Sequence, residues 1–171
     1  FVDSAQTAGS FPIDVKKMNI DMMAFSGHKS LMGPTGIGAM YVRDGLEVAP
    51  LVYGGTGSRS EEEIQPDFWP DKMESGTVNI CAIRGLNASL KFILSKGITE
   101  VIKKKELIIT YLLEGLKELK NVIIYGPDNM KNRIAPVSIN IKDVKPSVVS
   151  GVLNKEDICV RVGLHCAPSA H

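Results

Sequence analysis

Residues 22–42 read MMAFSGHKSLMGPTGIGAMYV, and this stretch decides the fold. The apolar residues 22–25 end at a small polar turn, 26–28, which is followed by Lys29 and a loop rich in glycine and proline. A second apolar run covers residues 37–42. Short apolar runs separated by glycine and proline are typical of strands joined by a turn. We therefore predict a strand, a functional turn that contains Lys29, and a second strand.

The position of Lys29 suggests chemistry. Burial at the end of a strand disfavours the charged form of an amine, and a neutral amine can attack an aldehyde. The alternative is an ordinary surface lysine in a loop. A nucleotide-binding loop at glycines 33–38 is a weaker alternative, because such a loop carries its lysine at the far end and opens a helix. Here the lysine comes first and a strand is predicted to follow.

Composition excludes several classes of protein. The chain has 171 residues, 44% hydrophobic and 23% charged, which is ordinary for a globular protein. A net charge of +1 gives no field that would attract nucleic acid, and no apolar run is long enough for a membrane span. Three cysteines without a Cys-x-x-Cys pair favour a reduced, cytoplasmic protein over a disulfide scaffold. We expect neither a nucleic-acid partner nor a membrane partner.

The remaining pattern predicts helices and strands in turn. A short strand at residues 1–2 precedes Asp3. Apolar periodicity predicts helices over 80–96, 99–119 and 146–153, and strands over 122–125, 137–141 and 158–162. The first helix has Gly97 as its stop, and its expected apolar face consists of Ile83, Leu86, Leu90, Ile93 and Leu94. We expect a strand-rich part over 1–79 and a helix linker with a small α+β domain over 80–171.

Three further groups of residues could have a structural or a chemical role. Asp3 could precede a helix as its N-cap, or its carboxylate could face a protonated heterocycle. Thr77 and Asn79 could cap the helix that follows them. Cys166 lies between His165 and a proline-containing loop, where an exposed thiol beside a cation can be reactive.

Structural, non-catalytic roles for Cys166 remain open. It could be a free structural cysteine, or it could form a disulfide with Cys159. A zinc site from Cys159, His165, Cys166 and His171 has suitable ligand types, but the spacing matches no usual pattern and we predict no metal.

Four motifs together resemble one family. Ser-x-His-Lys at 26–29, followed by a glycine-rich loop and a strand, is similar to the cofactor-lysine motif of the class V aminotransferase superfamily, which includes the cysteine desulfurases. The other motifs follow in the family's order: Asp-x-x-Gln at 3–6, Glu-x-Gly-Thr-x-Asn at 74–79 and Arg-x-Gly-x-His-Cys at 161–166. The resemblance spans nearly the whole chain. It implies an α/β fold, the C-terminal part of the large domain of a type I, aspartate aminotransferase-like transferase followed by a small α+β domain.

The resemblance also implies roles around pyridoxal 5'-phosphate. Lys29 would bind the cofactor covalently and act as the proton-transfer base, with Ser26 and His28 on the phosphate. Asp3 would hold the proton on the pyridine nitrogen, which makes the cofactor a better electron sink. Gln6 would lie near the ring hydroxyl. Thr77 would reach the phosphate in the neighbouring subunit, so that a homodimer shares its active sites.

The function that the resemblance implies is cysteine desulfuration. Sulfur would leave L-cysteine as a persulfide on the nucleophile Cys166, alanine would be the product, and an acceptor protein would take the sulfur on for iron–sulfur cluster or thio-cofactor synthesis. Arg161 and His165 would orient the substrate. Selenocysteine lysis, transamination or an inactive module remain alternatives. The family's earlier half and its last segment are missing, so we expect a piece of a longer protein.

Overall fold

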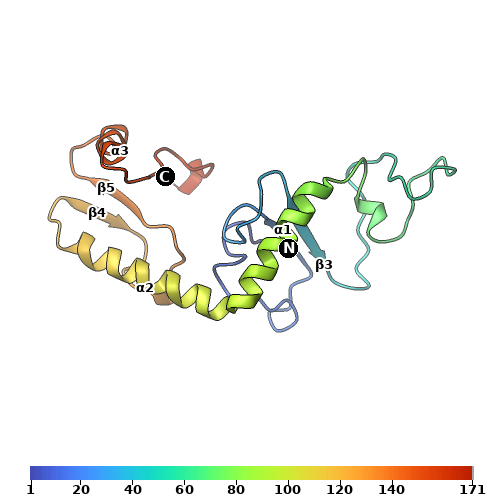
Figure 1. Ribbon diagram of the computed structural model, residues 1–171, viewed down its shortest axis with the longest axis horizontal. Helices are drawn as coiled ribbons and strands as arrows, with labels where there is room; N and C mark the ends of the chain where they lie inside the picture. Colours follow the sequence, from blue (N-terminus) through green and yellow to red (C-terminus); the bar gives the residue numbers. More distant parts are fainter. Residues whose placement is uncertain (171) are drawn as a thin grey trace. The chain divides into compact units, whose positions relative to one another are not determined.

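The structure, a computed structural model, describes residues 1–170, with the side chains of all of them except 132 and 170. The chain divides into two compact units, of which the first covers Phe1–Ile102 and the second begins at Lys103. Figure 1 labels the helices and strands. The predicted domain boundary near residue 80 stays a prediction.

The first unit contains a three-stranded sheet. Its strands are β1 (Val2–Asp3), β2 (Met22–Ser26) and β3 (Gly38–Val42), in the order β1-β2-β3. β1 runs parallel to β2, and β3 runs antiparallel to it. The predicted strand, turn and strand are therefore confirmed.

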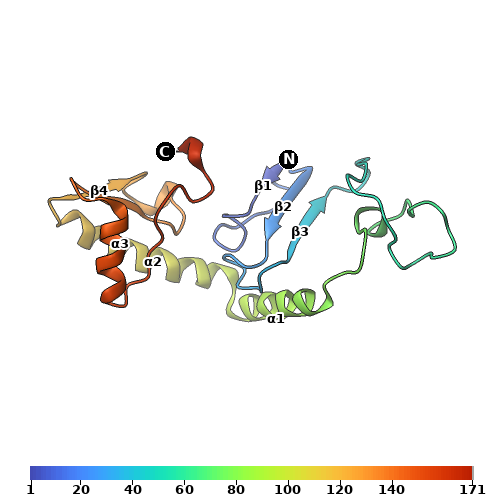
Figure 2. The same cartoon turned by 90° about the horizontal axis from the view of Figure 1, so that it is seen from above.

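Helix α1 (Ile80–Lys96) supplies the core beside this sheet (Figure 2). Leu86 and Ile93 are buried in one cluster with Ala8 and Leu31, and the partly buried members of that cluster are Phe25, Ile37, Leu90 and Ile98. The helix matches its predicted bounds. Part of the predicted face is wrong, because Ile83 is 45% exposed and Leu94 is 73% exposed.

The ends of α1 have clear local causes. The side chain of Asn79 accepts a hydrogen bond from the amide of Ala82 at 3.1 Å, which satisfies a donor that the first helical turn leaves unpaired. At the other end Gly97 has φ +82°, a conformation that glycine adopts without steric cost. The predicted stop at Gly97 is confirmed.

A long loop joins β3 to α1 and contains one short 3-10 helix, η1 (Asp71–Met73). Lys72 is 7% exposed, and its Nζ lies 3.0 Å from Oδ1 of Asp67. Nε2 of Gln65 donates to the carbonyl of Lys72 at 2.6 Å, and the amide of Gly76 donates to the carbonyl of Gly55 at 2.8 Å. These polar contacts close the loop just before Thr77.

The second unit has a two-stranded antiparallel sheet of β4 (Val122–Tyr125) and β5 (Ser138–Ile141). Helix α2 (Ile98–Lys117) leads into this unit, and α3 (Pro146–Lys155) contacts β5 (Figure 1). Two short 3-10 helices, η2 (Met130–Asn132) and η3 (Pro168–Ala170), complete it. Along both strands half-buried residues alternate with exposed ones, as the alternating sequence of residues 137–141 predicts for β5.

The predicted last strand over 158–162 is wrong. The segment is irregular, and its alternating apolar residues are exposed: Ile158 by 50%, Val160 by 47% and Val162 by 43%. A strand must pair its backbone amides and carbonyls with a neighbour. Within residues 1–170 this segment has no such partner strand, so the β-branched pattern is not realised.

None of the helices within the described residues combines the length and the apolar character that a membrane crossing needs.

Candidate active site

Two of the predicted motifs leave the first sheet at the same edge. Because β1 and β2 are parallel and Asp3 pairs with Ala24, the carboxyl ends of both strands lie at one edge. The amide of Ser4 continues the pairing by donating to the carbonyl of Ala24 at 2.8 Å. In open α/β sheets this edge is where ligands bind. The Asp3 segment (residues 3–11) and the Lys29 turn (residues 26–33) therefore start side by side.

Asp3 is exposed, and its carboxylate is hydrogen-bonded to the backbone that follows it. Its Oδ1 accepts a hydrogen bond from the amide of Ala5 at 2.8 Å. The amides of Thr7 and Ala8 both donate to the carbonyl of Ser4, at 3.1 and 2.9 Å. The next regular element in the described chain is β2 and not a helix, so the N-cap interpretation of Asp3 is wrong. Gln6 is exposed on the same segment.

The Lys29 turn is closed by three backbone hydrogen bonds. The amide of Gly27 donates to the carbonyl of Ile37 at 2.8 Å, and the amide of Gly33 donates to the carbonyl of Gly27 at 2.8 Å. The amide of Met32 donates to the carbonyl of Lys29 at 2.9 Å. These bonds fix the backbone on both sides of the lysine.

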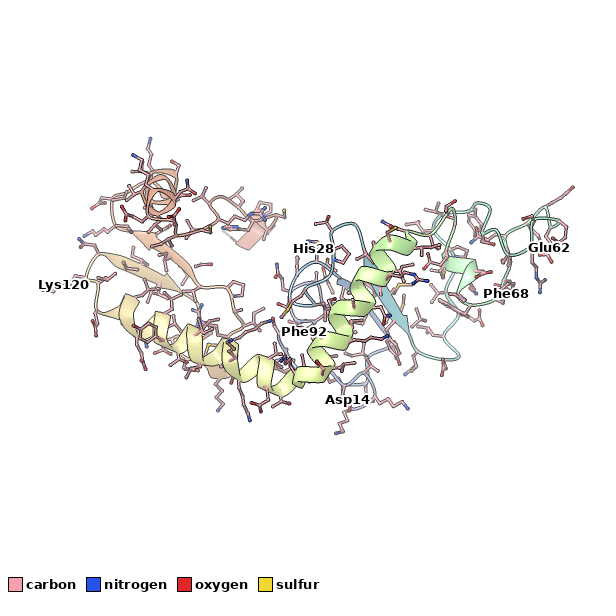
Figure 3. All side chains as sticks on the ribbon, viewed as in Figure 1. Asp14, His28, Glu62, Phe68, Phe92 and Lys120 are labelled. Atoms are coloured by element: carbon pink, nitrogen blue, oxygen red, sulfur yellow. The ribbon has the colours of Figure 1, made fainter. Side chains whose placement is uncertain are left out.

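The side chains of the turn stay accessible. Ser26 and Lys29 are partly exposed and His28 is exposed, as its projection from the turn in Figure 3 shows. We expected a buried strand to remove Lys29 from water. This is only partly correct, because Met23 is the single buried residue of β2 and Lys29 stays partly exposed. The arrangement combines a fixed backbone with reachable amine, hydroxyl and imidazole groups.

Helix α1 packs directly against this turn. A Cβ added to Gly33 would lie 2.8 Å from the carbonyl oxygen of Gly27 and 2.8 Å from Cδ1 of Leu86. A Cβ added to Gly27 would lie 2.9 Å from Cγ2 of Ile37. Both positions need glycine for lack of space, which explains why glycines flank the lysine.

Thr77 is exposed in the closed loop that precedes α1. The sequence predicted that Thr77 and Asn79 could cap the helix that follows them. In the structure Asn79 is the N-cap of α1. Gly76 of the same motif has φ +88°, a conformation that glycine adopts without steric cost.

Cys166 occupies a tight turn of the second unit. The amide of Ala167 donates to the carbonyl of Leu164 at 2.8 Å, and the two residues between them have positive φ: +52° for His165 and +62° for Cys166. This is the pattern of a type I′ turn, which normally uses glycine or asparagine. Residues other than glycine are uncommon in such conformations, and they cluster at functional sites.

The structure tests the disulfide and the zinc site that the sequence left open for Cys166. Cys81, Cys159 and Cys166 are all free and exposed, which excludes the disulfide. Among residues 1–170 no group of three or more His, Cys, Asp and Glu side chains could hold a metal ion. His171, a member of the zinc alternative, lies outside the described residues. Arg161 is exposed on the irregular segment before the turn.

The predicted residues therefore form two groups. Six belong to the first unit: Asp3, Gln6, Ser26, His28, Lys29 and Thr77. Three belong to the second: Arg161, His165 and Cys166. The roles assigned to them stay predictions.

Sequence reasoning missed a group of serines beside the first set. Ser4 is completely buried, and its Oγ has no hydrogen-bond partner among the described residues. Oγ of Ser10 lies 2.5 Å from Oγ of Ser30, the residue after the lysine. Serines in polar turns are common, so no sequence pattern distinguishes these three.

Comparison with known proteins agrees with the motifs. The family model described as aminotransferase class-V matches residues 1–171. A probable cysteine desulfurase of Pyrococcus abyssi is 40% identical over 173 residues, which are 97% of this chain and 42% of that protein. A cysteine desulfurase of Haloferax volcanii is 38% identical and is matched by 100% of this chain, over 41% of its own length. The chain thus spans about two fifths of the length of these relatives.

Solved structures give the same result for the fold. The apo structure of a cysteine desulfurase from Thermococcus onnurineus NA1 superposes with a TM-score of 0.82 at 35% identity, over 97% of this chain and 42% of that chain. The cysteine desulfurase CsdA (S-sulfonic acid) from Escherichia coli gives 0.80 at 29% identity, over 98% and 42%. The predicted fold class, part of an α/β transferase of the pyridoxal-phosphate type, is confirmed. The chain belongs to the class-V aminotransferase family.

Proposed function

We propose that this chain carries the cofactor lysine and the sulfur nucleophile of a pyridoxal-phosphate-dependent cysteine desulfurase, which converts L-cysteine to L-alanine and an enzyme persulfide. Relatives 38–40% identical that bear this name support the proposal. The observation that carries it is local: the Asp3 segment and the Lys29 turn start at one edge of a parallel strand pair.

The side chains at this edge fit pyridoxal phosphate chemically. Lys29 offers an amine to the aldehyde, and Asp3 offers a carboxylate to the ring nitrogen. Oδ1 of Asp3 accepts from the amide of Ala5, which orients the carboxylate and leaves Oδ2 for a further partner. Ser26 and His28 offer hydrogen-bond donors suited to a phosphate, and Gln6 offers an amide to the ring hydroxyl.

The cofactor, when bound, supplies an electron sink for the negative charge that develops on the substrate. Lys29 moves the proton of the substrate α-carbon, for which an accessible amine on a fixed backbone is suited. Asp3 keeps a proton on the ring nitrogen by its negative charge.

Cys166 takes the sulfur. Its thiolate attacks the sulfur of L-cysteine, so that an S–S bond forms as the C–S bond of the substrate breaks. The electron pair of the C–S bond stays with the substrate carbon, which takes up a proton and becomes the methyl group of alanine. Arg161 and His165 orient the substrate or the thiolate beside it.

The proposal extends to assembly and location. Thr77 serves the phosphate site of a neighbouring subunit, which requires a homodimer, and an acceptor protein removes the persulfide sulfur. A cytoplasmic location is supported by three free, exposed cysteines. The domain boundary near residue 80 belongs to the same proposal.

The first experiment mixes the purified chain with pyridoxal phosphate. We expect a visible absorption band that is lost in Lys29→Ala and kept in Lys16→Ala, since Lys16 is exposed but lies outside the turn. An unchanged spectrum of the unsubstituted chain would instead support a non-catalytic module.

The second experiment adds L-cysteine to the cofactor-loaded chain and measures persulfide and alanine. Cys166→Ala should abolish both products, whereas Cys159→Ala, at an equally free and exposed thiol, should keep them. Release of a keto acid that survives Cys166→Ala would support transamination. A preference for selenocysteine would support the lyase alternative.

A further inference from the structure

The Asp3 segment and the Lys29 turn are joined by a contact that the proposed chemistry does not use. Oγ of Ser10 and Oγ of Ser30 lie 2.5 Å apart, a short hydrogen bond between two part-buried hydroxyls. The two serines are 20 residues apart in sequence. One of them directly follows Lys29, so the contact acts on the peptide unit beside the lysine.

Gly9 brings the two backbones close enough for this contact. It is buried and has φ +81°, and a Cβ at this position would lie 2.8 Å from both the carbonyl carbon and the carbonyl oxygen of Ser30. Any other residue would combine backbone strain with a clash against main-chain atoms, which have little room to move. On either side of the contact, Ala8 and Leu31 are buried in one hydrophobic cluster.

Backbone hydrogen bonds hold the segment between Asp3 and Ser10 in a fixed conformation, so the position of Ser10 is tied to that of Asp3. The carbonyl of Ser4 accepts from the amides of Thr7 and Ala8, and the carbonyl of Thr7 accepts from the amides of Ser10 and Phe11, at 2.9–3.1 Å. These two consecutive turns leave few free backbone torsions between the carboxylate and the serine.

We propose that Gly9 and the Ser10–Ser30 hydroxyl pair form a positioning latch that sets the Lys29 turn relative to Asp3. In this proposal the three residues act through the spacing of the amine and the carboxylate, and not by contact with substrate or cofactor. This inference rests on the proposed function for its purpose. Its structural content, that the latch holds the turn closed, stands independently.

The first test needs no cofactor. Hydrogen exchange is measured at the amides of Met32 and Gly33, whose bonds to the carbonyls of Lys29 and Gly27 close the turn. In Ser10→Ala these amides should exchange about fivefold faster, the effect of losing one hydrogen bond worth about 1 kcal/mol. Ser95→Ala is the matched control, because its hydroxyl donates to the carbonyl of Phe92 within α1.

The second test measures capture of pyridoxal phosphate by its visible band. Ser10→Ala and Ser30→Ala should each weaken the equilibrium about fivefold, and the double variant should weaken it by less than the two single effects combined, because the two changes share one bond. The midpoint of the pH titration of the band should move in the same variants. Ser10→Thr keeps a hydroxyl and should restore capture, which a purely packing role would not predict.

Two results would overturn the latch: exchange at Met32 and Gly33 in Ser10→Ala equal to that in Ser95→Ala, or weakening that adds up in the double variant. A failure of the unsubstituted chain to capture the cofactor would refute the proposed function instead. In that case the exchange experiment still decides whether the serine pair holds the turn.

Discussion

Replacing Gly33 by alanine tests how the Lys29 turn is built. Gly33 is not held in a positive-φ conformation, so the substitution adds only steric conflict. The new Cβ would lie 2.8 Å from the carbonyl oxygen of Gly27 and 2.8 Å from Cδ1 of Leu86. Real Cβ atoms essentially never approach other atoms more closely than 3.0 Å, so one neighbour must move.

Neither neighbour moves at low cost. The carbonyl of Gly27 already accepts from the amide of Gly33 at 2.8 Å, so moving it weakens that bond. Leu86 is 8% exposed and lies in the core cluster. Overpacking costs about 1–3 kcal/mol and a lost hydrogen bond about 1 kcal/mol, so the free energy of unfolding should fall by roughly 2–4 kcal/mol.

Urea unfolding followed by tryptophan fluorescence measures the change in the free energy of unfolding of the first unit. The chain has one tryptophan, Trp69, and it lies in the same compact unit as Gly33. Gly55→Ala is the control, because a Cβ there meets nothing within 4 Å and the residue has no positive φ. That control should change the free energy of unfolding by no more than about 0.5 kcal/mol.

If Gly33→Ala unfolds at the same urea concentration as Gly55→Ala, the packing of α1 on the turn is not as described. The same variant should also lose capture of pyridoxal phosphate. Loss of capture without loss of stability would mean that the turn opens without disturbing the core, which contradicts the close contact with Leu86.

Three further substitutions test single features. Asn79→Ala should lower the free energy of unfolding by about 1 kcal/mol through loss of the α1 cap, and exposed Asn87→Ala should not, by urea unfolding. Ser4→Ala should raise it by about 1 kcal/mol, because a buried hydroxyl without a partner in the described part of the chain is removed; a loss of stability would mean that the hydroxyl is bonded. Gly115→Ala in α2, where a Cβ meets nothing within 4 Å, should stabilise the helix by about 0.5–1 kcal/mol in thermal melts followed by circular dichroism, and a lower melting temperature would contradict this.

The sequence predicts local elements well where one pattern dominates. Glycine and proline between two apolar runs locate the turn after β2, and Asn79 and Gly97 mark the ends of α1. Each of these signals lies within a few residues of the feature that it predicts. Local sequence is therefore sufficient to predict the local structure at these places.

Predictions fail where the outcome depends on a partner elsewhere in the chain. The alternating residues 158–162 have the composition of a strand, but pairing decides whether a strand forms, and the described chain offers no neighbour. Along α1 apolar residues occur on more than one face, so the pattern included the exposed Ile83 and Leu94. The Ser10–Ser30 pair depends on Gly9 resting against Ser30, a contact that no periodicity encodes.

The most direct test of the central claim is chemical mapping of the cofactor lysine. The chain is incubated with pyridoxal phosphate, reduced with borohydride and digested, and the modified peptide is identified by mass spectrometry. We expect the label on Lys29, in the turn between β2 and β3. A label spread over exposed lysines such as Lys16 and Lys17, or no label at position 29, would contradict the proposed role of the turn.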